Sequence, residues 1–61
     1  MIIKVYVVIQ TVDGIEHIKG VFSSEYRAYR FVESFSNFDD YSIKVYLLNN
    51  TTQESLRVIT F

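Results

Sequence analysis

The sequence contains no cysteine and no proline, and it has only two glycines and one histidine. Without cysteine the chain forms no disulfide bond and no thiolate metal site, and a single histidine argues against a structural zinc site. Two glycines do not make a phosphate-binding loop. Local spacing forms no catalytic triad around His17, which we interpret as a surface residue. We therefore predict a non-enzymatic protein that uses no metal ion and no cofactor.

The short length of the chain is the next constraint. Its 61 residues make one domain, residues 1–61, with 49% hydrophobic and 16% aromatic residues and a net charge of −1. A chain of this size buries only about 60% of the surface that its unfolded form exposes. Since disulfides and metals are excluded, a partner subunit is the remaining means of stabilisation. We therefore expect a homodimer.

The sequence gives no sign of membrane insertion or export. The longest apolar run, Val5 to Ile9, is too short to span a bilayer. The first residues lack the basic region and long apolar core of a signal peptide. The absence of cysteine fits a reducing compartment. We expect a cytoplasmic location and no membrane partner.

An apolar β-hairpin is predicted at residues 2–22. Two alternating apolar runs, residues 2–12 and 15–22, flank Asp13-Gly14, which is the strongest short-range hairpin signal. With a two-residue loop, the expected cross-strand pairs are Val12–Ile15, Ile9–Ile18, Val7–Gly20 and Val5–Phe22.

A helix and a second hairpin follow. Within residues 24–36, apolar side chains recur with a helical period, at Ala28, Phe31, Val32 and Phe35. Strands are predicted at residues 41–48 and 53–61. The order ββαββ indicates an α+β fold with a four-stranded antiparallel sheet, strand order 2-1-3-4, and one helix packed on one face. The alternative order 1-2-3-4 would place the second and third strands parallel.

One helix covers only one face of four strands, so the other face is predicted to be uncovered. We expect the aliphatic side of the first strand, which carries Ile3, Val5, Val7 and Ile9, to face the helix. Four of the six cationic residues and no acidic residue then lie on the uncovered face. Its predicted members are Lys4, Tyr6, Val8, Gln10, Val12, Ile15, His17, Lys19, Val21, Ser42, Lys44, Tyr46, Leu48, Arg57, Ile59 and Phe61.

Three interpretations of this face are open. In one, lysine and arginine stems cover the apolar side chains and keep their charged ends in water. In another, the face is a dimer or partner interface, because aromatic residues are enriched in interface cores. This interface would use Tyr6, Val8, Tyr46, Leu48, Ile59 and Phe61. In the third, the face binds single-stranded nucleic acid by base stacking and phosphate contacts. This site would use Lys4, Tyr6, Lys19, Lys44, Tyr46 and Arg57.

Two further surfaces are predicted. The outer side of the helix carries Tyr26, Tyr29 and Arg30, which form a second possible partner patch. A flat face-to-face dimer would bring like charges together across its axis, so we expect a dimer that is offset toward the C-terminal strand. Ile59 and Phe61 would be its main contacts.

The stretch Gly20-Val21-Phe22-Ser23-Ser24-Glu25, followed by an aromatic-rich helix and a tyrosine-containing strand, resembles short uncharacterised proteins of phages and Gram-positive bacteria. The resemblance covers most of the chain in layout. It implies a small protein that binds a host protein in the host cytoplasm and inhibits antiviral defence, as Hachiman anti-defence proteins do. It assigns no functional residue.

Overall fold

The computed structural model describes residues 3–48 and 55–61. Four strands form one antiparallel sheet in the order β2-β1-β3-β4, so the predicted α+β fold and strand order are confirmed. The predicted turn at residues 49–52 lies outside the described residues. The elements are β1 (Lys4–Val12), β2 (Ile15–Phe22), the α-helix α1 (Glu25–Glu33), the 3-10 helix η1 (Phe38–Asp40), β3 (Tyr41–Leu47) and β4 (Arg57–Thr60).

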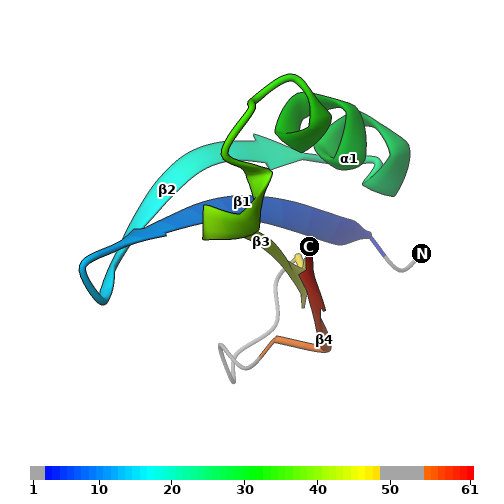
Figure 1. Ribbon diagram of the computed structural model, residues 1–61. Helices are drawn as coiled ribbons and strands as arrows, with labels where there is room; N and C mark the ends of the chain where they lie inside the picture. Colours follow the sequence, from blue (N-terminus) through cyan, green and yellow to red (C-terminus); the bar gives the residue numbers. More distant parts are fainter. Residues whose placement is uncertain (1–2, 49–54) are drawn as a thin grey trace.

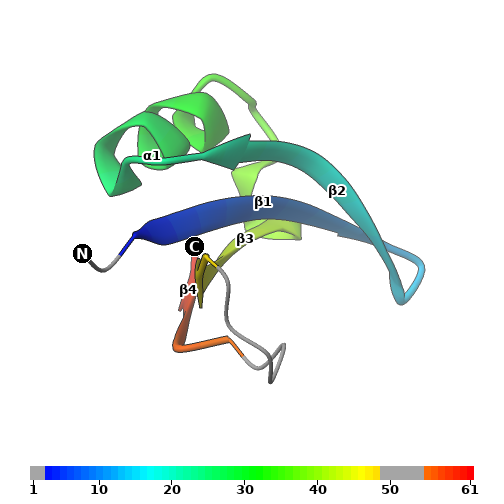
Figure 2. The same ribbon diagram turned by 180° about the vertical axis from the view of Figure 1, so that it is seen from behind.

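The helix lies on one side of the sheet, over β1 and β2 (Figure 1). The reverse view shows the same two layers and the same uncovered opposite side (Figure 2). The turn between β1 and β2 projects well beyond the end of the helix in both views. Ile15, next to this turn, is therefore 60% exposed although it is apolar.

The β1–β2 turn has the predicted geometry. Asp13 has φ 53° and Gly14 has φ 79°, so both central residues adopt positive φ, as a type I′ turn requires. The predicted pairs Val12–Ile15 and Ile9–Ile18 are present. The two-residue loop therefore sets the register of the outer half of the hairpin.

The inner half of the hairpin differs from the prediction. The register shifts between Val8 and Ile9, because β2 contains one extra residue, Lys19. Beyond this bulge Val8 pairs with Gly20 and Tyr6 pairs with Phe22, so the predicted pairs of Val7 with Gly20 and Val5 with Phe22 are wrong. A shift of one residue moves side chains to the opposite face of a strand.

The bulge reverses the predicted orientation of β1. Phe22 contacts the helix through Phe31, with ring centroids 5.3 Å apart. Because Tyr6 pairs with Phe22, it shares that side of the sheet and packs against the core, as Val8 does. The prediction that Val5, Val7 and their neighbours face the helix is therefore wrong.

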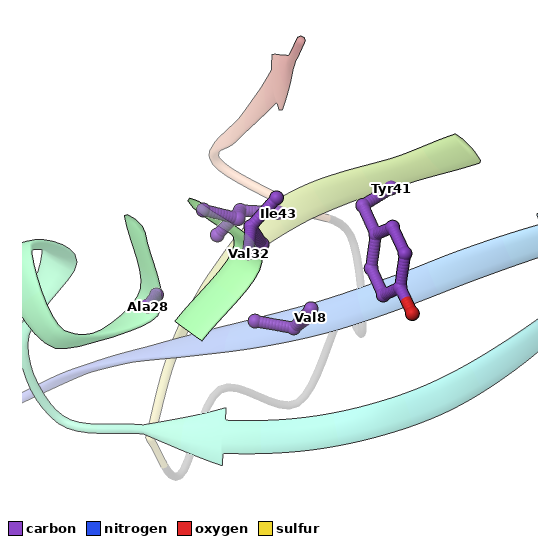
Figure 3. Packing of buried hydrophobic residues seen from close by; sticks show 5 residues of the cluster. All are labelled: Val8, Ala28, Val32, Tyr41 and Ile43. Atoms are coloured by element: carbon purple, nitrogen blue, oxygen red, sulfur yellow. The ribbon is translucent and has the colours of Figure 1, made fainter. Parts of the chain in front are cut away.

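The core lies between α1 and the central strands. Five residues form its buried cluster, as Figure 3 shows: Val8, Ala28, Val32, Tyr41 and Ile43. Ala28 and Val32 are the two fully buried positions of the predicted helical stripe. Ile43 and Val45 of β3 are buried on the same side of their strand.

Aromatic rings extend this core along the helix. Phe31 contacts Phe35 with ring centroids 5.1 Å apart, and Phe35 stacks on Tyr41 at 5.0 Å with an interplanar angle of 11°. Aromatic pairs of this kind contribute about 0.5–1.5 kcal/mol beyond their buried area. The row Phe22–Phe31–Phe35–Tyr41 therefore joins β2, α1 and β3.

The helix is shorter than predicted. It begins after Ser24, which has extended φ and ψ angles and makes no side-chain cap hydrogen bond, and it ends at Glu33. Phe35 lies beyond its end, where its backbone N–H donates to the carbonyl of Val32 at 3.0 Å. Asp39 and Asp40 belong to η1.

We expect Ile43→Val to lower the free energy of unfolding by about 0.5–1.5 kcal/mol, because it removes one methylene group from a fully buried site. Ile15→Val is the matched control: Ile15 is 60% exposed in β2, and a surface change of this kind stays within about 0.5 kcal/mol. Urea denaturation followed by circular dichroism measures both. Equal effects of the two substitutions would contradict this core.

Candidate interaction surfaces

The side of the sheet that faces away from α1, here called the open face, is mostly aliphatic. Its polar members are Thr11, Glu16, Ser42, Lys44 and Thr60. The strand register and the Leu48–Ile3 backbone hydrogen bond place nine apolar residues on it: Ile3, Val5, Val7, Ile9, Ile18, Val21, Tyr46, Leu48 and Val58.

Several of these apolar side chains are open to water. Ile18 is 70% exposed, Val21 61%, Leu48 50%, Val58 49% and Ile3 44%. Single exposed apolar residues are normal on soluble proteins, but a contiguous set on one face is typical of an interaction site. The open face is therefore the first candidate surface.

One ion pair crosses this face. The Nζ of Lys44 in β3 lies 3.2 Å from the Oε1 of Glu16 in β2, and β1 runs between them. In the strand register Lys44 pairs with Val7, and Glu16 pairs with Thr11. The ion pair between Lys44 and Glu16 therefore crosses β1 at Ile9. The pair thus passes over Ile9, which is 4% exposed, and its two charges cancel, so we infer that the lysine stem shields Ile9 from water.

The predicted interface set does not share one face. Tyr46 and Leu48 lie on the open face as predicted. The placement of the other four, Tyr6, Val8, Ile59 and Phe61, is wrong, because they lie on the helix side, where Val8 is fully buried and the other three pack around the cluster. The expected offset dimer was to use Ile59 and Phe61 as its main contacts. Both residues instead pack against the core on the helix side.

The predicted nucleic-acid residues are also divided between the two sides. Lys4 and Tyr6 belong to the helix side of β1, and Arg57 forms an ion pair with Glu25 at the start of α1. Lys19 is the extra residue of the bulge. Of the four cations assigned to that face, the register places only Lys44 on the open face, and its charge is matched by Glu16.

The predicted helix patch is divided too. The guanidinium of Arg30 lies 5.9 Å from the ring centroid of Tyr26, and its Nη1 donates to the hydroxyl of Tyr26 at 3.4 Å. Tyr29 is half-buried and packs edge-on against Phe61, with ring centroids 5.4 Å apart. Only Tyr26 and Arg30 therefore form an outward-facing pair.

Tyr29 and Phe61 instead line a cavity of about 400 Å³ on the helix side. Val32, Glu33 and Phe38 complete its lining. Glu33 and Phe38 are not among the site residues predicted from the sequence. Their convergence depends on how η1 turns the chain back after the helix, and local spacing does not encode that.

The described residues show no cluster of metal-binding side chains. His17 is exposed, as predicted. Within residues 3–48 and 55–61, no group of three or more histidine, cysteine or carboxylate side chains is placed to hold a metal ion. No helix in this part of the chain is long and apolar enough to cross a membrane.

Comparison with protein-family models, with curated proteins and with solved structures finds no match to this chain.

The role of the lysine stem over Ile9 is testable. We expect Lys44→Met to change the free energy of unfolding little, because the pair is partly exposed and the methionine keeps the apolar stem. Lys44→Ala removes the stem, so we expect it to cost about 1 kcal/mol more. Urea titrations measure the difference. An alanine variant as stable as the methionine variant would show that the stem does not shield Ile9.

Proposed function

We propose that this chain is a protein-binding module and that the open face is its contact surface. The observation that supports this proposal is a sheet face with nine apolar residues, five of them 44–70% exposed. Burying a large apolar side chain contributes about 1.5–3 kcal/mol relative to full exposure. A partner that covers this face therefore gains free energy from several residues at once.

The occupant that the charge pattern favours is a second copy of the chain. The charged residues that the register places on the open face, Lys44 and Glu16, form a neutral pair, so two copies related by a two-fold axis do not bring these charges together unbalanced. Lys4 and Arg57, which argued against a face-to-face dimer, lie on the helix side. We therefore propose a face-to-face homodimer in place of the offset dimer.

The variant that tests this dimer is Val21→Lys. Val21 is 61% exposed on the open face, and a lysine there would place a charge in the interface. We expect its dimer dissociation constant to rise at least tenfold, which corresponds to a cost of about 1.4 kcal/mol. Light scattering across a dilution series measures this change.

Ile15→Lys is the matched control, since Ile15 is 60% exposed in the same strand but lies on the helix side. We expect it to leave the dissociation constant unchanged. A native chain that stays monomeric at every concentration, or equal weakening by both lysines, would contradict the face-to-face dimer.

The biological role that we propose is inhibition of a host antiviral defence protein. It is supported by the resemblance of residues 20–25 and the following helix to small phage proteins, and it is compatible with a protein-binding surface. We expect co-expression with a Hachiman defence system in bacteria to restore plaque formation by a phage that this system blocks. Unchanged plaque numbers at confirmed expression would count against this role.

Nucleic-acid binding is the alternative role, and the charge distribution gives it little support. Binding through phosphates needs several cations on one surface. Here Arg57 and Lys44 are each engaged by a carboxylate, on opposite sides of the sheet. Salt-sensitive binding of single-stranded DNA or RNA would overturn the protein-binding proposal.

A further inference from the structure

Two aromatic rings that contact each other line the cavity on the helix side. Tyr29 comes from α1 and Phe61 follows β4, and their rings meet edge to face at 5.4 Å between centroids. Val32, which is fully buried, lies in the core beneath the cavity. The cavity of about 400 Å³ is within the range of small-ligand sites.

Two further residues shape the opening of this cavity. Phe38 of η1 adds a third aromatic ring and is 45% exposed. Glu33, the last residue of α1, is exposed and is the only charged side chain that the described residues contribute to the lining. The cavity thus combines three aromatic rings with one carboxylate.

No cation of the described residues neutralises Glu33. The two ion pairs within residues 3–48 and 55–61 are those of Lys44 with Glu16 and of Arg57 with Glu25. Arg30, three residues before Glu33 on the helix, is turned to Tyr26 instead. The carboxylate therefore remains available to a ligand.

We propose that this cavity binds an organic cation, an ammonium or guanidinium group carried on an apolar stem. Aromatic faces attract such cations, and the carboxylate of Glu33 adds a full opposite charge. The stem packs against the aromatic rings. The site lies across the sheet from the open face, so it is independent of the proposed dimer.

The test uses two probes of equal shape, n-butylguanidinium and uncharged n-butylurea, titrated into ¹⁵N-labelled protein. We expect shifts in the amide signals of Tyr29, Glu33 and Phe38, and at least threefold tighter binding of the cation. Glu33→Gln should reduce this preference, since it removes the carboxylate and leaves the rings. Asp39→Asn is the matched control, because Asp39 is an exposed acid of η1 that does not line the cavity.

A second variant tests the rings. Phe38→Leu keeps an apolar side chain but loses the aromatic face, so we expect about twofold to fivefold weaker binding of the cation, from the 0.5–1 kcal/mol of exposed cation–π contacts. If Phe38→Leu unfolds the chain, the binding measurements on Glu33→Gln still test the proposal, because Glu33 is exposed. Equal affinity for the two probes, or an unchanged preference in Glu33→Gln, would overturn the proposal.

A capped Gly-Arg-Gly peptide distinguishes the sources of the cation. Binding of the peptide at least as tight as that of n-butylguanidinium would assign the cavity to an arginine side chain of a partner protein. Binding of n-butylguanidinium alone would assign it to a free organic cation. Shifts confined to residues outside the cavity would contradict both assignments.

Discussion

The arrangement of this molecule depends on a single β-bulge. Lys19 is an extra residue of β2 that has no partner in β1. Because of it, Ile18 and Gly20 lie on opposite sides of the sheet. The outer half of the hairpin keeps the register set by the Asp13-Gly14 turn, and the inner half brings Phe22 to the helix side. Without the extra residue, Phe22 would share a side with Val5, and the opposite face of β1 would meet the helix.

The bulge separates two kinds of apolar surface. The helix side collects aromatic rings, which suits a helix of nine residues, because large side chains fill the space that such a short element leaves over the sheet. Space there is tight: a Cβ atom on Gly20 would lie 2.9 Å from the ring of Phe22. The open face is mostly aliphatic and lacks a covering element of the described chain. Its exposed aliphatic side chains fit a broad protein contact.

Local pairing of charges gives the two sides different electrostatic character. On the open face Lys44 is neutralised by Glu16, and at the start of α1 Glu25 is neutralised by Arg57. Glu33 has no such partner among the described residues. A neutral apolar face and a cavity with one carboxylate select different ligands, so the two proposed sites can act independently of each other.

The sequence by itself determined the element order, the Asp-Gly turn and the helical stripe of Ala28 and Val32, because each follows from local periodicity and turn chemistry. It left two strand orders open, and the pairing of distant strands decided for β2-β1-β3-β4. It did not determine which side of β1 is buried, since both sides of that strand carry apolar residues. Only tertiary packing decided this, through the bulge that lets Phe22 reach Phe31. A glycine within a strand, here Gly20, was the one local sign of an irregular ladder. The composition of the open face and the convergence of Tyr29, Glu33 and Phe38 depend on contacts between residues distant in sequence, which no local pattern contains.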